Sequence, residues 1–158
     1  MMVKVGEYNK LKVSRMVDFG VYLDDGKDGI LLPVRFVPPG TKAGDDLNVF
    51  IYHDSEDRII ATTQEPKAVL GDIVKLRTIS TTPQGAFLDW GLMKDLFVPA
   101  SKQITRMIPN GEYLVKLYLD EQTGRLAATE KLEPFLSNEQ LTVNILSYNN
   151  ILLLQQSI

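Results

Sequence analysis

Basic and aromatic side chains flank aliphatic ones in two stretches near the start of the chain. Lys10 and Lys12 lie on either side of Leu11, and further along Tyr22 precedes Leu23. Successive side chains of a β-strand point to opposite faces, so on two neighbouring strands these cations and this ring would share the outer face. Aromatic rings stack on bases at about 1–3 kcal/mol per base while cations follow the phosphates. The pattern therefore favours non-covalent binding of unpaired nucleotides.

The same pattern recurs later in the chain. Lys75 and Arg77 flank an aliphatic residue, and Phe87 precedes another, as Tyr22 does in the first stretch. A further expected strand in each half also carries rings or cations at its outward positions. These positions are Phe50 and Tyr52, and then Lys116 and Tyr118.

Residues suited to covalent chemistry are scarce. The chain has no cysteine and a single histidine, His53, at the end of an expected strand. A zinc site needs several converging His, Cys or carboxylate ligands, and the clustered acids fall at expected turns. We predict a protein that is not an enzyme and has no metal site, no cofactor and no small-molecule substrate.

The overall charge limits how nucleic acid could be bound. With 17 Lys and Arg against 20 Asp and Glu, the net charge is −3, so phosphate contacts must come from a local face. No apolar run is long enough for a signal peptide or a membrane span. These features predict a cytoplasmic protein that does not associate with a membrane.

An internal repeat organises the chain. Residues 6–24 align without a gap on residues 71–89, placing Gly20 on Gly85. With single-residue insertions the match extends to ArgIleIleAlaThr at 58–62 and ArgLeuAlaAlaThr at 125–129. A series of this length predicts two copies of one structural unit.

Each copy contains five short runs rich in β-branched, aliphatic and aromatic residues, separated by turn residues. The predicted strands are 8–16, 19–25, 29–36, 47–53 and 58–63, then 73–80, 84–90, 95–99, 113–119 and 125–130. No long helical period is present, and one helical turn is expected around 100–104. We predict an all-β fold of two consecutive five-stranded OB-type barrels, at 1–67 and 68–138. A double-psi or SH3-like barrel is the alternative.

Several segments resemble known proteins. AspPheGlyValTyrLeuAsp at 18–24 and GlnGlyAlaPheLeuAsp at 84–89 resemble the second strand of S1 RNA-binding domains. The segments at 52–63, 89–92 and 125–132 resemble the bacterial CvfB-like, YitL-type proteins (conserved virulence factor B). The resemblance covers residues 1 to about 138.

The resemblance implies tandem S1-like barrels that bind single-stranded RNA and influence gene expression. Carried over by position, the ligand wall would involve Phe19, Tyr22, Asp54 and Arg58, and then Phe87, Asp120 and Arg125. Together with the pattern of cations and rings, the predicted RNA-binding residues are Lys10, Lys12, Phe19, Tyr22, Tyr52, Arg58, Lys75, Arg77, Phe87, Tyr118 and Arg125. Simple alternation points Phe19 inward, whereas a bulge at Gly20 would turn it to the wall of Tyr22.

The chain also departs from the S1 pattern. Leu32 and Val98 stand where the third strand of S1 domains has a histidine, and Gln84 replaces the first aromatic of the second unit. With the acidic charge balance, these differences support an alternative function, a protein–protein interaction scaffold that has lost strong RNA binding.

The C-terminal segment 139–158 is apolar and is predicted to form a β-hairpin around Asn149 and Asn150. Two placements stay open, as the start of a truncated third S1 unit or as added strands on one of the two barrels. A lone apolar hairpin is not stable in water, so a homodimer formed through this tail is a further possibility.

Overall fold

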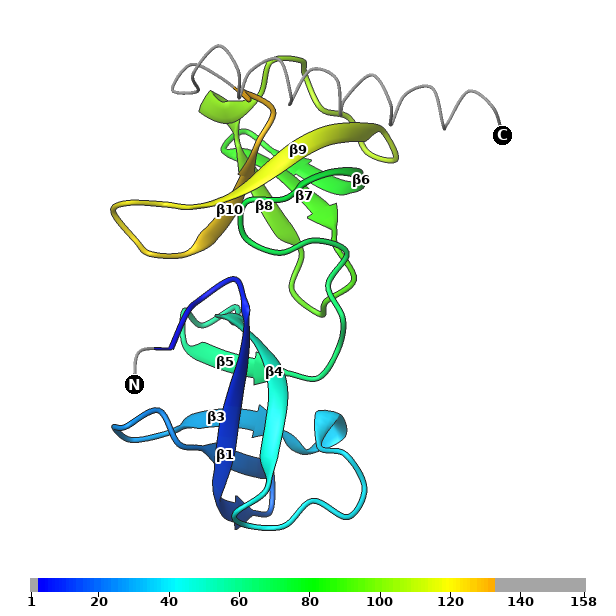
Figure 1. Cartoon of the computed structure of the whole chain (residues 1–158). Coiled ribbons are helices and arrows are strands. Elements are labelled where there is room, and N and C mark those ends of the chain that lie inside the picture. The colour runs from blue at the N-terminus through cyan, green and yellow to red at the C-terminus, as the bar shows by residue number, and fades with distance from the viewer. Residues whose placement is uncertain (1–2, 133–158) are drawn as a thin grey trace.

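Ten strands in two groups of five make up residues 3–132, the part of the chain that the structure, a computed structural model, describes (Figure 1). The first group is β1 (Tyr8–Val17), β2 (Gly20–Leu23), β3 (Ile30–Pro33), β4 (Asp46–His53) and β5 (Ile59–Thr62). The second group is β6 (Ile73–Thr82), β7 (Gly85–Asp89), β8 (Leu96–Pro99), β9 (Glu112–Leu119) and β10 (Leu126–Thr129).

The first group closes into a barrel in the order β1-β2-β3-β5-β4. All neighbours pair antiparallel except β3 and β5, which meet in parallel at Leu31 and Ile60. The second group has the order β10-β9-β6-β7-β8, with β8 and β10 close to each other at the ends of the sheet. The predicted all-β fold of two five-stranded, OB-type units is confirmed.

One predicted strand extends too far. The sequence predicts a strand over 29–36, but β3 ends at Pro33 and a 3₁₀ turn, η1 (Val34–Phe36), follows. Proline has no N–H for the next ladder bond, so the strand ends there. The second unit repeats this ending, with Pro99 followed by η2 (Ala100–Lys102), inside the range predicted for a helical turn.

The glycines at the start of β2 and β7 allow two strands to approach closely. A Cβ atom on Gly20 would lie 2.2 Å from the carbonyl oxygen of Leu32, and one on Gly85 would lie 2.3 Å from that of Val98. Any side chain would push the neighbouring strand away. The close approach draws β2 onto β3 and β7 onto β8, which sets the outer faces of these strands side by side.

The inward positions of the strands form two apolar cores. Leu11, Val13, Val21 and Leu23 are buried in the first barrel, as their alternation predicts. The matching core of the second barrel includes Leu76, Ala86, Leu88, Leu96, Val98, Val115 and Leu117. This second core extends beyond its own strands and takes in Phe50 and Tyr52 from β4 of the first barrel.

The interface between the barrels corrects the prediction that Phe50 and Tyr52 face solvent. Phe50 is 0% exposed and Tyr52 is 6% exposed, because the second barrel covers the outer face of β4. The ring centroid of Trp90 lies 5.6 Å from that of Phe50 and 6.2 Å from that of Tyr52, both edge-to-face. Such aromatic pairs contribute about 0.5–1.5 kcal/mol beyond the area they bury. Tyr52 is therefore largely covered by the second barrel, and what remains of its surface lines a groove beside β5.

Two predictions fall outside the described residues, namely the end of the second unit beyond residue 132 and the C-terminal hairpin at 139–158. Within residues 3–132, no helix is both long enough and apolar enough to cross a membrane.

Candidate nucleic-acid interface

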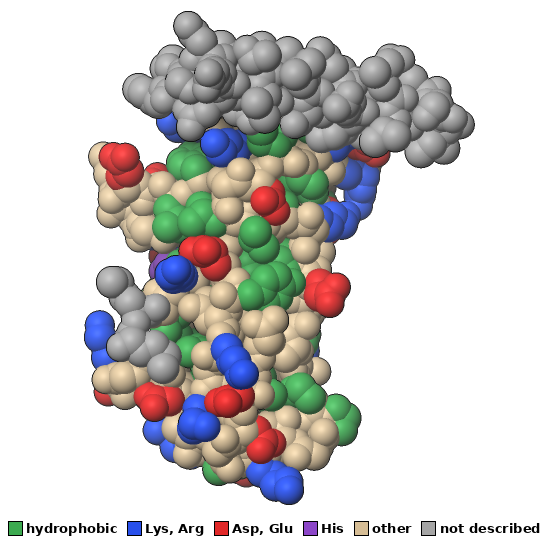
Figure 2. Space-filling view, in the orientation of Figure 1, with side chains coloured by type: hydrophobic (Ala, Val, Ile, Leu, Met, Phe, Trp, Pro, Cys, Tyr) green, Lys and Arg blue, Asp and Glu red, His purple; other side chains and the backbone are tan. Residues whose placement is uncertain are grey.

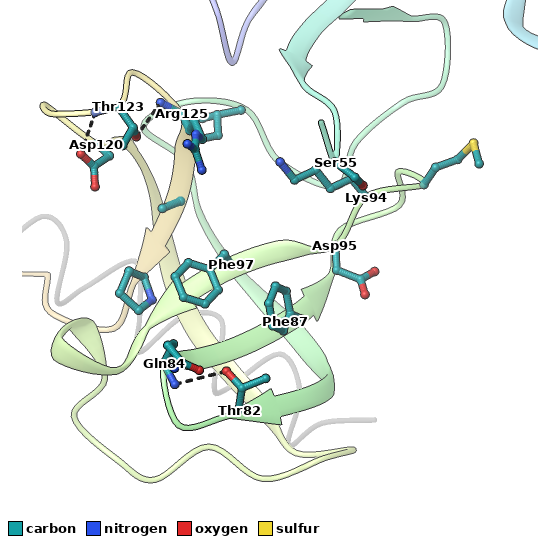
Figure 3. Close-up of a pocket in the computed structure, with 14 residues that line it drawn as sticks. Ser55, Thr82, Gln84, Phe87, Lys94, Asp95, Phe97, Asp120, Thr123 and Arg125 are labelled. Atoms are coloured by element: carbon teal, nitrogen blue, oxygen red, sulfur yellow. Dashed lines mark hydrogen bonds between the residues drawn. The ribbon is translucent and has the colours of Figure 1, made fainter. Parts of the chain in front are cut away.

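The outer face of β7 and β8 forms the floor of a groove of about 820 Å³ on the second barrel. Phe87 on β7 and Phe97 on β8 are opposite each other in the ladder, with ring centroids 5.2 Å apart and ring planes 43° apart. Both rings are half-buried and line the open groove (Figure 3). Their exposed surfaces are the kind of platform on which a flat apolar ring stacks.

Charged groups of both signs border this floor. Lys94 and Arg125 lie on the side of the groove that faces the first barrel, across from Thr82 and Gln84 (Figure 3). Two acids, Asp95 and Asp120, also line the groove. The groove is thus an apolar platform with charges of both signs at its rim rather than a basic channel.

The two acids of the groove differ in their surroundings. The Asp120 carboxylate accepts hydrogen bonds from the backbone N–H groups of Gln122 at 2.8 Å and Thr123 at 3.1 Å, so it holds the turn between β9 and β10. Burial, and then the neighbouring Asp89, raise the pKa of Asp95 above its ordinary value of 3.8. The negative charge on Asp95 is therefore disfavoured beside the rings.

The first barrel presents a related face built on a bulge in β1. The ladder register shifts between Val13 and Arg15, and this shift pairs Arg15 with Tyr22 on β2. The Arg15 guanidinium carbon lies 4.1 Å from the centroid of the Tyr22 ring. Phe19 is 56% exposed and meets Tyr22 edge-to-face at 6.2 Å. The structure thus places Phe19 on the wall of Tyr22, in the tight turn that precedes Gly20.

A second, smaller groove of about 280 Å³ lies on the outer side of β3 and β5. Arg35, Phe36, Arg58 and Lys94 contribute to its lining. Arg58 forms ion pairs with Asp54 at 3.0 Å and Glu56 at 2.9 Å. This groove therefore offers two aromatic rings, Phe36 and the largely buried Tyr52, and three cations, together with the acids Asp54 and Glu56.

The Asp54 carboxylate is held in its charged form. Burial alone would raise the pKa of Asp54, but the backbone N–H groups of Arg58 and Glu56 and the Arg58 guanidinium outweigh it and lower the pKa below 3.8. The same carboxylate bonds two backbone N–H groups of its own turn. Asp54 thereby orients Arg58 at the edge of the smaller groove.

The predicted cations on β1 and β6 line neither groove. Lys12 lies 3.3 Å from Asp46, Lys75 lies 3.2 Å from Glu112, and Arg77 lies 3.9 Å from Asp89. Lys10 is exposed and pairs in register with Asn48 on β4. The outward positions of β1 and β6 adjoin those of β4 and β9, which carry acids. On the face shown in Figure 2, cations and acids are accordingly interspersed.

Tyr118 takes the place in the second barrel that Tyr52 has in the first. It is half-buried, and the Lys102 Nζ atom lies 5.6 Å from its ring centroid. Burial, and then Asp120, raise the pKa of Tyr118. Of the predicted residues, the larger groove gathers Phe87, Asp120 and Arg125, whereas Tyr118 lies outside its lining.

Phe97 and Lys94 are among the residues of the larger groove that sequence reasoning missed. Phe97 is predictable from the sequence, because alternation along 95–99 places it outward beside Phe87. Lys94 had no such signal, since it lies in the loop between β7 and β8 and only the packing of the two barrels directs it toward Asp54.

His53 lies between the barrels without a role in either groove. It is half-buried, and its Nδ1 atom has no hydrogen-bond partner. Burial, and then the nearby Lys94 and Arg125, lower its pKa below 6.5. Among residues 3–132, no group of three or more His, Cys, Asp or Glu is arranged to hold a metal ion.

The chain is similar to several known proteins. Residues 5–64 match the S1 domain family. Over 97 residues the chain is 31% identical to the uncharacterized protein YitL of Bacillus subtilis, covering 61% of this chain and 33% of YitL. A crystal structure of a multidomain protein with nucleic acid binding domains from Streptococcus pneumoniae is 18% identical with a TM-score of 0.37, covering 95% of this chain and 61% of that one. The predicted resemblance to CvfB-like, YitL-type proteins with S1 domains is confirmed by the first two comparisons.

Proposed function

We propose that this CvfB-like protein with an S1 domain binds single-stranded RNA through its barrel faces, without catalysing a reaction. The observation that carries the proposal is the Phe87–Phe97 pair, whose rings lie 5.2 Å apart on the floor of an open groove. Unpaired bases stack on such rings, and duplexed bases do not, because their faces are already covered.

The cations at the rim support contacts to the backbone of the strand. Arg125 is ion-paired with Asp57, but the two side chains are 45% and 52% exposed. Exposed pairs of this kind contribute at most about 1 kcal/mol, so a phosphate can replace the carboxylate at small cost. Lys94 lies at the same rim.

The cellular role that we propose is regulation of gene expression in the cytoplasm. It follows from the resemblance to CvfB-like proteins, and the aligned part of the chain spans 33% of YitL. The regulatory role therefore belongs to the proposal and is tested separately from RNA binding.

One observation favours the scaffold as a second candidate function. Most of the predicted RNA-binding cations form ion pairs, among them Lys12, Lys75, Arg77 and Arg58. A surface whose cations are already neutralised attracts phosphates weakly. A scaffold would use the same exposed rings to contact a protein.

Titration of fluorescent oligouridylate at low and moderate salt tests the proposal. We expect saturable binding that weakens with salt and that falls about tenfold or more in Phe87→Ala and in Phe97→Ala, since each ring contributes about 1–3 kcal/mol. Tyr8→Ala is the matched control, because Tyr8 is 42% exposed and lines neither groove. Absence of saturable binding at low salt, or equal losses in all three variants, would overturn the proposal in favour of the scaffold.

A further inference from the structure

The two grooves share a wall. Ser55, Met93 and Lys94 line both the 820 Å³ groove of the second barrel and the 280 Å³ groove of the first. Ser55 belongs to the turn between β4 and β5, whereas Met93 and Lys94 belong to the loop between β7 and β8. The grooves are therefore adjacent, and they meet where a loop of each barrel touches the other.

Lys94 is fixed at this meeting point. Its Nζ atom donates a hydrogen bond to the backbone oxygen of Asp54 at 3.0 Å, and its own backbone oxygen accepts a hydrogen bond from the Trp90 indole. An ammonium group has three donors, of which the Asp54 oxygen uses one. Lys94 thus places its Nζ atom at a defined position between the two grooves.

The barrels on either side cannot turn freely about this point. Phe50 and Tyr52 of the first barrel pack against Trp90 of the second, and the Gly6 carbonyl accepts a hydrogen bond from the Leu70 N–H at 2.8 Å. With Arg125–Asp57 at 3.0 Å, apolar and polar contacts hold the grooves in one relative orientation. A ligand that spans them does not have to order two separate domains.

We propose that the two grooves form one continuous site for a single RNA strand, and that Lys94 binds the phosphate at which the strand passes from one barrel to the other. This inference rests on the proposed function and adds that both barrels bind the same strand. Bases stack on Phe87 and Phe97 in the larger groove and on Phe36 in the smaller one. Once one groove is occupied, the second binds at a high effective concentration.

Binding stoichiometry tests continuity. We compare oligouridylates of about 4 and about 16 nucleotides, the limits of the range bound by single OB folds. For a continuous site the long strand binds one per chain and at least tenfold more tightly than the short strand. Phe87→Ala and Arg35→Gln should then each lower the affinity for the long strand and leave the stoichiometry at one strand per chain. Two long strands per chain, with each variant removing one of them, would overturn continuity.

Lys94 variants test the junction. Lys94→Met keeps the length of the side chain and removes its charge, whereas Lys94→Arg keeps the charge. We expect Lys94→Met to weaken the binding of the long strand more than that of the short strand. It should also lower the slope of log affinity against log salt by about 0.7, the value of one phosphate contact on a single strand. Lys94→Arg should retain both the affinity and the salt slope of the unaltered chain. Equal losses for both lengths or an unchanged salt slope would overturn the role of Lys94.

These outcomes are distinct from failure of the proposed function. If RNA does not bind the unaltered chain at low salt, both proposals fail together. If RNA binds and depends on Phe87, but Lys94→Met leaves the salt slope unchanged, only the continuous site fails. Urea unfolding of each variant accompanies the titrations, so that a loss of binding is compared only among folded proteins.

Discussion

The Arg125 guanidinium of the second barrel lies 3.0 Å from the Asp57 carboxylate of the first. Asp57 has a φ angle of 63°, in the left-handed region that Asp and Asn enter more readily than other non-glycine residues. One residue therefore combines an exposed ion pair between the barrels with an unusual backbone conformation, and substitutions can separate the two effects.

We expect Asp57→Asn to change the free energy of unfolding by less than about 1 kcal/mol, because the ion pair is exposed and Asn tolerates the left-handed region. Asp57→Val should cost about 1–2 kcal/mol more, since a β-branched side chain is strained at this φ angle. Urea unfolding of both variants measures the difference. Equal losses would show that neither charge nor backbone strain at Asp57 dominates.

Trp90 should matter far more to stability than any ion pair. It is 2% exposed and contacts Phe50 and Tyr52 across the interface, so we expect Trp90→Ala to lose about 3–5 kcal/mol of unfolding free energy. Trp90→Phe keeps a ring and loses the indole hydrogen bond, which predicts a smaller loss. Thermal unfolding should also split into two transitions in Trp90→Ala, and a single unshifted transition would contradict the coupling.

The internal repeat makes much of the fold predictable from the sequence. The alignment of Gly20 with Gly85 and of the Arg-led segments placed all ten strands within a few residues, because each strand is bounded by turn residues. The inward residues were also predictable, as alternation assigns Leu11, Val13, Leu76 and their neighbours to cores. The 3₁₀ turn after Pro33 was missed, although proline marks the end of the ladder.

The candidate site was less predictable because faces are covered by other parts of the molecule. Alternation correctly turned Tyr52 away from its own barrel, but it contains no information about the second barrel that covers this side chain. It also gave Lys12 and Arg77 the same outer face without indicating that Asp46 and Asp89 would neutralise them. Lys94 became visible only when the barrels were placed together.

Stability should decline on mild acidification because of His53. Burial, and then Lys94 and Arg125, lower the pKa of His53 below 6.5 in the folded protein, so the unfolded chain binds the proton more tightly. Its contribution is fully present above pH 6.5 and is lost as the pH falls from there toward the lower, folded pKa. We expect the urea concentration at the unfolding midpoint to decrease as the pH is lowered from about 7.5 to about 5.5. The His53→Gln variant should show a smaller decrease over the same pH range. An unchanged profile in the variant would assign the decline to other groups.

The first barrel lacks the aromatic pair of the second, and this difference predicts a substitution that increases RNA affinity. Leu31 is opposite Tyr22 in the first barrel as Phe97 is opposite Phe87 in the second. We expect Leu31→Phe to create a second ring pair and to raise RNA affinity about tenfold, within the range of one stacked base. Phe97→Leu is the reciprocal variant and should lower the affinity. If Leu31→Phe has no effect on fluorescence titrations, the ring pair is not what binds bases.

The aromatic side chains that the first barrel contributes to the second core have a consequence for dissecting the protein. A fragment that starts at the expected boundary of 68 would keep every strand from β6 to β10 and lose Phe50 and Tyr52, leaving the indole of Trp90 bare to water. We expect such a fragment to self-associate through its exposed apolar surface and to be digested readily by proteases. The boundary between the two repeats in the sequence therefore separates residues that pack in one shared hydrophobic core.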